Sequence, residues 1–321
     1  MAIQSVALVT ESNKVSSSDL MKVSSALQKQ ATRDLAPIWE VNASVDPFDK
    51  LEDVPDGVWP MIIMDDIGFP GAAGIHLDRD GQPFALITAA TELDRWALTA
   101  SHEMCEMLVD PFGKKQVTGD SPKPGQDRVS FLVEVCDPSE AADFAYSVNG
   151  ILVSDFYTPH FFDPVKAEGV RYSFTGHITA PRKVLRGGYL SWTDPVSNHL
   201  WQEMFPINQP SSDFIDRGPV PADLASLRLY VDTLTAAFTA EALDRGRLRA
   251  VAAGMPIAGS DASSRANADA WRARSRRSLE KVKGSQAEKP SRPAGPNAAG
   301  RPRKRDTVSR RRTARGSMPP N

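Results

Sequence analysis

Hydrophobic and polar residues follow two different periods along the first 110 residues, and the two periods alternate. Short runs of apolar and β-branched residues predict β-strands, whereas apolar residues at spacings of three and four predict amphipathic helices. Ser and Asp residues near the start of residues 16–35 fit a helix cap, and Pro111 ends the helix predicted over residues 92–109. The predicted order is strand 3–10, helix 16–35, strand 38–45, strand 59–66, a hairpin over 74–88 with an Arg-Asp-Gly turn, and helix 92–109.

From about residue 113 to residue 202 the apolar runs are short, and turn-forming residues separate them. Asn149-Gly150 is a hairpin signal, and residues 187–202 have the aromatic density typical of packed loops. We therefore expect a loop-rich β region here, within a first domain that covers residues 1–205. The strand-like runs are residues 128–137, 146–156 and 170–178.

Beyond residue 205 the pattern changes twice. Residues 206–260 contain a linker and an amphipathic helix over residues 222–250, whose apolar stripe is expected to dock on the body of the protein or on another copy. Residues 261–321 lose apolar periodicity and gain Ser, Pro, Ala and Arg, so we expect a disordered basic tail. The stripe consists of Leu224, Leu227, Val231, Leu234 and Phe238.

The composition is ordinary for a soluble globular protein, with 41% hydrophobic and 24% charged residues. No stretch approaches the roughly 18 apolar residues of a membrane helix, and the N-terminus lacks a basic segment followed by an apolar run. Cys105 and Cys136 are the two cysteines, which excludes a disulfide framework and leaves one disulfide between them open. We therefore expect a cytoplasmic protein with no membrane partner.

The net charge of −2 conceals a division between an acidic body and a basic tail. Residues 265–321 hold 17 Lys and Arg against 4 Asp and Glu, whereas residues 1–264 hold 21 against 36. Such a tail can contact nucleic acid or another acidic partner, but only non-specifically, because it has no interleaved aromatics and no reading module. A solvated tail, or one that lies on the acidic body, is the alternative.

The candidate chemistry lies on helix 92–109, in the sequence HEMCE. His102 and Glu106 are one helical turn apart, so both side chains can reach one metal ion, and imidazole and carboxylate are both zinc ligands. Glu103 lies about 100° round the helix from His102, where the corresponding residue of HExxH motifs addresses the attacking water. Glu106 in place of the second His makes the site more anionic, which also suits other divalent metals harder than zinc.

A His-Glu pair in a helix is common, so an ordinary amphipathic helix is the competing interpretation. Asp110 in the last turn opposes the helix dipole, which implies a cationic partner or a metal. The downstream sequence VEVCDP supplies Glu134 and Asp137 at the end of a strand-like run, where either residue suits a further ligand. These features favour the metal site.

Together these segments resemble a known family. SHEMCEMLVDPFG followed by VEVCDP is similar to the HExxE…DP pattern with a downstream Glu-x-x-Asp in zincin-like proteins, which include a bacterial and phage-associated group and the plant phosphate-induced, or exordium-like, family. The resemblance covers about residues 1–205, and the run from LQKQATRDLAPIWEV to GGYLSWTDPVSNHLWQ looks like the bacterial group. The chain departs from well-characterised peptidases by lacking the second His and the Gly-x-x-His extension.

The resemblance implies an α+β fold in which a zincin-like mixed sheet carries an active-site helix, and it implies a metal site. The residues make His102, Glu106 and Asp137 the expected Zn²⁺ ligands, with Glu134 as the alternative third ligand and Asp110 in the surroundings of the site. Glu103 is then the general base of a zinc peptidase or related hydrolase that acts on a peptide or protein, whose extended chain would pair with an edge of hairpin 74–88. The alternative is an inactive zincin-shaped protein that serves in binding or assembly.

Other side chains receive simpler interpretations. Cys105 lies three residues from His102, but no third group orients such a pair, so a small buried Cys is favoured over a thiol nucleophile. His160 is a further candidate ligand from a loop, although a packed or surface His is favoured, and His76 is expected to face solvent on the hairpin. The tyrosines that can each assist an oxyanion are Tyr146, Tyr157 and Tyr189, and the sequence does not choose among them.

Overall fold

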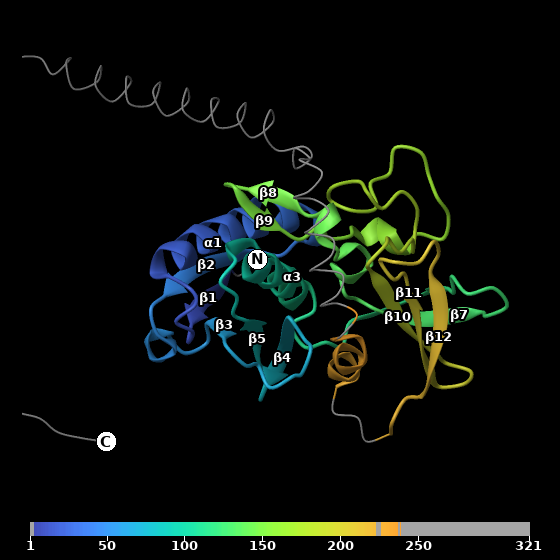
Figure 1. The fold of residues 1–321 in the computed structure, drawn as a ribbon. Coiled ribbons are helices and arrows are strands. Elements are labelled where there is room, and N and C mark those ends of the chain that lie inside the picture. The colour runs from blue at the N-terminus through green and yellow to red at the C-terminus, as the bar shows by residue number, and fades with distance from the viewer. Residues whose placement is uncertain (1–2, 223–225, 237, 239–321) are drawn as a thin grey trace, which may run out of the picture. The chain divides into compact units, whose positions relative to one another are not determined.

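The apolar runs of the N-terminal half form a five-stranded sheet in a computed structural model that describes residues 3–222, 226–236 and 238 (Figure 1). Its strands are β1 (Gln4–Thr10), β2 (Ala43–Phe48), β3 (Trp59–Met64), β4 (Gly74–Arg79) and β5 (Gln82–Thr88). The order across the sheet is β2-β1-β3-β5-β4, and all neighbours run parallel except β4, which pairs antiparallel with β5 at the edge. Asp80 and Gly81 both have positive φ in the turn of this hairpin, which confirms the predicted turn.

The first helical segment extends further along the chain than residues 16–35, the range that the sequence pattern predicts. Its segments are α1 (Ser17–Lys29), the π-helical turn η1 (Gln30–Leu35) and α2 (Ala36–Trp39). Ser16 caps the start with its side chain, and the wide π turn precedes Pro37, which has no N–H to give to a regular helical ladder. Glu40 ends the helix in the left-handed region at φ 56°. The predicted strand from residue 38 is therefore wrong in its first half, because the chain is still helical there.

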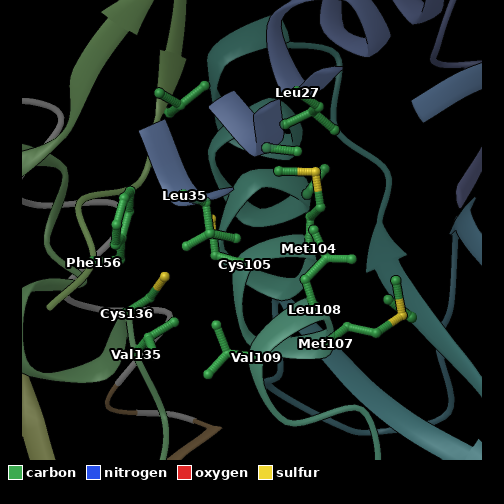
Figure 2. Packing of buried hydrophobic residues seen from close by; sticks show 14 of the residues in the cluster. Leu27, Leu35, Met104, Cys105, Met107, Leu108, Val109, Val135, Cys136 and Phe156 are labelled. Atoms are coloured by element: carbon green, nitrogen blue, oxygen red, sulfur yellow. The ribbon is translucent and has the colours of Figure 1, made fainter. Parts of the chain in front are cut away.

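Helix α3 (Leu93–Val109) lies between the first sheet and the hairpin formed by β8 (Tyr146–Val148) and β9 (Ile151–Val153) (Figure 1). All its residues from Trp96 onward are buried, so α3 is a core helix with no solvent-facing side over that length. Asn149 and Gly150 both have positive φ in the β8–β9 turn, as predicted. Figure 2 shows part of the apolar packing around α3, with Leu27, Leu35, Met104, Cys105, Met107, Leu108, Val109, Val135, Cys136 and Phe156 labelled.

The second sheet contains strands that the sequence pattern missed. Its members are β6 (Gln116–Asp120), β7 (Arg128–Leu132), β10 (Tyr189–Asp194), β11 (His199–Met204) and β12 (Asp213–Pro219), in the antiparallel order β12-β11-β10-β7-β6. Residues 187–202 were expected to be packed loops, and they form the β10–β11 hairpin instead. The first four residues of β10 are all buried, so the alternation that identifies a strand is absent. β12 continues this sheet past residue 205, where we expected the first domain to end.

Two further strand predictions need correction. β7 ends at Leu132, and the rest of the 128–137 run enters a 3₁₀ turn, η3 (Asp137–Ser139). Residues 170–178 form no strand and make one isolated bridge, between Tyr157 and Ser173, before Gly176 turns the chain at φ 82°. The extended segment after β7 therefore leaves its sheet and runs toward α3, which brings Glu134 and Asp137 to the helix.

Residues 227–236 are helical, in agreement with the part of the predicted 222–250 helix that the structure describes. Their apolar side chains pack on Leu132, Tyr189, Leu200 and Met204 of the second sheet. Leu224, the residues from 239 onward and the whole predicted basic tail 261–321 lie outside the described residues. Among the helices that are described, none is both long enough and apolar enough to cross a membrane.

Candidate metal centre

Helix α3 carries a concentration of ionisable side chains into the interior. His102, Glu103 and Glu106 are 8%, 5% and 0% exposed, although burying a charged group is unfavourable unless other charges or hydrogen bonds compensate it. Gly74 on β4 lets the helix approach the sheet here, because a Cβ at this position would lie 2.5 Å from Thr99 Cγ2 and 2.7 Å from Glu103 Oε1. The fold therefore brings these groups together in a place that is unfavourable for each of them alone.

The three residues expected to be metal ligands lie together. His102 Nε2 is 3.4 Å from Glu106 Oε2 and 3.3 Å from Asp137 Oδ1. Donor atoms about 2.1 Å from a tetrahedral zinc ion are about 3.4 Å apart, so both distances fit the edges of such a site. Glu106 and Asp137 also belong, with Glu134, to a set whose donor atoms lie within 4.8 Å of one another. His102 therefore lies beside both Glu106 and Asp137, although none of the ligand sets found among the described residues contains all three together.

Asp137 reaches this point through the turn η3. Pro138 follows it within the turn, and Gly188, which precedes β10, packs against the turn's backbone. A Cβ on Gly188 would lie 2.6 Å from the carbonyl oxygens of both Asp137 and Pro138, so only glycine fits this contact. The second sheet therefore holds the aspartate in position against α3.

His76 on β4 also belongs to the centre, and the expectation that it faces solvent is wrong. Its side chain is fully buried on the face of β4 that carries Gly74, and this face meets α3. Nε2 lies 3.2 Å from the carbonyl oxygen of Asp110, and since a carbonyl only accepts, Nε2 donates. Nδ1 is left as the free nitrogen, 3.6 Å from Glu103 Oε2 and 3.9 Å from Glu106 Oε2. A glycine two residues before a histidine on a strand was the sequence signal for a close, helix-facing position.

Arg228 is the second residue that the sequence analysis missed. It lies on the helix of residues 227–236, is 3% exposed, and donates from Nη2 to Glu106 Oε2 at 2.6 Å. Its Nη1 donates to Glu134, so Glu134 pairs with an arginine. The available signal was the position of Arg228 in the apolar stripe, one residue after Leu227 and three before Val231. A charged residue in a stripe that packs inward requires a buried partner.

The charges of the centre shift the pKa values in opposite directions. Burial lowers the pKa of His102, but the Glu106 and Asp137 carboxylates outweigh burial and raise it well above 6.5. Burial raises the pKa of Glu106, but His102 and Arg228 outweigh it and hold that pKa well below 4.5. Burial, with the charge of Glu106 added, raises the pKa of Glu103 and of Asp137 to about 8 each. The centre therefore holds more carboxylates than its own cations neutralise, and two of them retain protons.

Several potential metal-ligating atoms in this centre are buried and make no hydrogen bond within the described part of the chain. His76 Nδ1, Glu103 Oε2 and Asp137 Oδ1 have no hydrogen-bond partner among the described residues. Burial and the charge of Arg228 lower the pKa of His76 well below 6.5, so its imidazole is neutral and presents a lone pair at Nδ1. This lone pair lies 3.6 Å from Glu103 Oε2 and 3.9 Å from Glu106 Oε2, and either a cation or the proton that Glu103 retains would relieve the repulsion between them. This set of buried His, Glu and Asp side chains could hold a divalent metal ion.

The remaining candidates have other roles. The Asp110 carboxylate accepts the backbone N–H groups of Lys114 and Lys115, and these amides stabilise it at the end of α3. Its carbonyl orients His76, which agrees with a place in the surroundings of the site. His160 is exposed and pairs with Asp163 at 2.9 Å, and it is in none of the potential ligand sets found among the described residues.

The structure also shows the environments of the cysteines and the tyrosines. Cys105 and Cys136 are both buried and free, so they form no disulfide. Tyr146 donates to Asp34, whereas the hydroxyl of Tyr157 is buried without a hydrogen-bond partner in the described part of the chain. Burial, followed by the charges of Glu106 and Asp137, raises the pKa of Tyr157 well above 10. Burial, followed by the charge of Asp137, also raises the pKa of Tyr189 well above 10, so the structure does not choose between Tyr157 and Tyr189.

Comparison with known proteins gives no match to this chain among family models, curated proteins or solved structures. Three overlapping ligand sets describe the centre, and Glu106 and Asp137 each belong to two of them. The sets are His76 with Glu103 and Glu106, His102 with Asp137 and Glu140, and Glu106 with Glu134 and Asp137.

Proposed function

We propose that this chain is a zincin-like, metal-dependent hydrolase of the peptidase type, with Zn²⁺ held by His102, Glu106 and Asp137. The observation that carries the proposal is the pair of distances from His102 Nε2, 3.4 Å to Glu106 and 3.3 Å to Asp137, which fit a tetrahedral site. One imidazole and two carboxylates are acceptable zinc ligands, and three protein ligands leave a fourth position for reaction. The parallel sheet with an antiparallel edge strand beside α3 supports the zincin-like part of the proposal.

Glu103 is the general base in this proposal. A bound zinc ion supplies Lewis acidity, lowering the pKa of water and polarising an amide carbonyl. Glu103 follows His102 directly on α3, and its Oε2 is buried with no hydrogen-bond partner among the described residues, so it is available to take a proton and return it to the leaving amine. Burial raises the pKa of Glu103 to about 8 in the metal-free protein, and a divalent cation bound beside it would lower that pKa, so that the ionised carboxylate could act as the base. His76 stands 3.6 Å from the same oxygen and limits where that carboxylate can lie.

The substrate class follows from the sheet edge. β4 is the terminal strand of the first sheet, so one side of its backbone has no neighbouring strand among the described residues. An extended peptide can pair with such an edge through main-chain hydrogen bonds. Because β4 also carries His76 into the centre, a peptide on this edge lies beside the catalytic groups. A peptide or protein is therefore the proposed substrate.

A second function is favoured by Arg228. Its guanidinium already neutralises Glu106 and Glu134, as a metal ion would. A chain that satisfies its own acidic cluster in this way can be a zincin-shaped protein without turnover, which serves in binding or assembly. In that case a basic tail remains available to contact nucleic acid or another acidic partner.

Substitution of Glu103 by Gln separates the two functions. We expect Glu103→Gln to retain stoichiometric zinc, measured by elemental mass spectrometry, and to lose turnover by at least about 100-fold in peptide-library profiling, because the proton acceptor is removed. Glu168→Gln, at an exposed position, is the matched control and should change neither quantity. Zinc without turnover in the wild-type protein would favour the binding function, and absence of stoichiometric metal would refute the metal centre.

A further inference from the structure

We propose that Arg228 is an internal competitor of the metal ion, so that zinc binding and docking of the helix of residues 227–236 are mutually antagonistic. This inference rests on the proposed metal centre, and it adds a mechanism that would govern whether the centre binds a metal ion. The helix would cover the centre in the metal-free protein and release it when the ion binds.

The competition concerns one atom, Glu106 Oε2. The other oxygen of this carboxylate, Oε1, accepts the backbone N–H of Cys136 at 3.1 Å and faces the segment that carries Asp137. Oε2 is the atom that His102 Nε2 and His76 Nδ1 approach, and Arg228 Nη2 donates to this same oxygen at 2.6 Å. A metal ion ligated by Oε2 would therefore stand next to the guanidinium. Two cations at such a distance in a buried site repel each other strongly.

Arg228 neutralises the acidic side of the centre without completing its hydrogen bonds. The guanidinium pairs with Glu106 and Glu134, lies 3.9 Å from Glu103 Oε2, and has Nε 3.3 Å from Asp232 Oδ2. Nε and Asp232 Oδ2 nevertheless have no hydrogen-bond partner among the described residues. The carboxylates raise the pKa of Arg228 above its ordinary value against the effect of burial, so the competitor stays charged. The Arg228 guanidinium is therefore a counter-ion of these carboxylates, and a divalent ion that the carboxylates and histidines bind directly can displace it.

The apolar side chains of the helix pack on a cluster distinct from the main core, although Asp232, Thr233 and Ala236 also line a pocket with Ile75 of β4. Val231 and its apolar neighbours pack on a small cluster formed by Leu132, Tyr189, Leu200 and Met204. The stem of Arg228 passes Gly113, where a Cβ would lie 3.0 Å from Arg228 Cβ, so the loop after α3 provides room for the arginine. Because α3 and the first sheet belong to the larger core, the helix can leave without dismantling the groups that would bind the ion.

Reciprocity makes the antagonism measurable from both sides. If docking of Arg228 weakens zinc binding, zinc must weaken docking by the same factor. We therefore titrate full-length wild-type protein and Arg228→Met with Zn²⁺ against a chelating indicator. Methionine keeps an apolar stem and removes the charge, so we expect Arg228→Met to bind Zn²⁺ at least about 10-fold more tightly. Arg186→Met, at an exposed arginine on the Phe205 ring, is the control and should match wild type.

A second measurement on the wild-type protein does not depend on a variant that folds. Hydrogen exchange of residues 227–236 should become faster when Zn²⁺ is added, while exchange in α3 stays unchanged or slows. Equal zinc affinities of wild type and Arg228→Met, or exchange in 227–236 that zinc leaves unchanged or slows, would overturn the competition and leave the metal centre intact. Zinc bound by neither protein would refute the metal centre and, with it, this inference.

Discussion

Two groups of buried polar side chains pack against α3, and they differ in how completely their hydrogen bonds are made. Around Ser101 the bonds form a closed ring. The Ser101 hydroxyl donates to Gln30 Oε1 at 2.8 Å, Ser154 N–H donates to Ser101 Oγ at 2.8 Å, and Gln30 Nε2 donates to the Ser154 carbonyl at 3.0 Å. One residue later, His102 begins a group in which several potential metal-ligating atoms have no hydrogen-bond partner in the part of the chain that the structure describes.

The two groups have similar burial, so burial alone does not identify a site. Ser101 and Gln30 are fully buried, as is Glu106. In the ring every donor meets an acceptor, which makes the group a rigid part of the core. In the proposed metal centre the carboxylates outnumber the charged groups Arg228 and His102, and a metal ion would balance the excess. The difference indicates that the composition of a buried polar group, donors matched or acceptors in excess, separates a structural network from a functional one.

The largest expected effect is on zinc affinity, and we expect it for a substitution of His102 but not for one of the adjacent Ser101. His102→Ala should weaken zinc binding by more than about 100-fold, because removing a ligand costs more than the 10–100-fold typical of changes around the ligands. Ser101→Ala should leave the zinc affinity unchanged. Both affinities are measured by competition with a chelating indicator, and equal losses in the two variants would contradict the distinction.

A pH series on metal-free protein tests the excess of carboxylates. Glu103 and Asp137 have folded pKa values of about 8, above their ordinary values of 4.5 and 3.8, so the folded state holds protons that the unfolded state releases. The free energy of unfolding from these groups therefore falls as the pH rises toward about 8. His76, with its lowered pKa, acts in the opposite direction only below about pH 6.5.

The informative window is therefore about pH 6.5 to 8, where His102, whose pKa is raised, adds to the fall. We expect the Tm of chelator-treated protein to drop by several degrees across this window. Saturating zinc should reverse the sign, because ligands must lose their protons to bind the metal. A Tm that is independent of pH without metal would contradict the pKa shifts of the centre.

The smallest effect concerns the closed ring. Ser101→Ala leaves Gln30 Oε1 without a donor and Ser154 N–H without an acceptor, so the free energy of unfolding should fall by about 1–3 kcal/mol. Ser18→Ala, on the exposed side of α1, should change it by less than about 0.5 kcal/mol. Urea unfolding followed by circular dichroism measures both. A neutral Ser101→Ala would mean that the ring does not stabilise the core.

The sequence pattern predicted those parts of the fold and site that depend on local spacing. The order of the first six elements follows from periodicity, and His102 with Glu106 follows from one turn of helix. The β10–β11 hairpin was missed because residues 189–192 are buried on both faces, which removes the polar positions that mark a strand. The segment at residue 38 was misassigned because the π turn before Pro37 prolongs the helix.

The missed members of the centre depend on contacts between segments far apart in the chain. His76 is buried because Gly74 lets β4 approach α3, and the glycine two residues before the histidine signals a close approach without identifying its partner. Arg228 pairs with Glu106 across 122 positions of sequence. Asp137 could be proposed from its motif, but its distance to His102 depends on η3 and on the contact of that turn with Gly188.

The late position of Arg228 in the chain has a consequence for biosynthesis. A ribosome makes the protein from the N-terminus, so His76, α3 and Asp137 all emerge before the helix of residues 227–236. At about 5–20 residues per second, the interval between Gly188, which holds Asp137 in position, and Arg228 lasts roughly 2 to 8 s. The nascent chain thus has its acidic cluster before it has the arginine that neutralises it. A cluster that forms in that interval is exposed to metal ions before Arg228 is available. The order of translation therefore favours binding of a metal ion by the carboxylates over their pairing with Arg228.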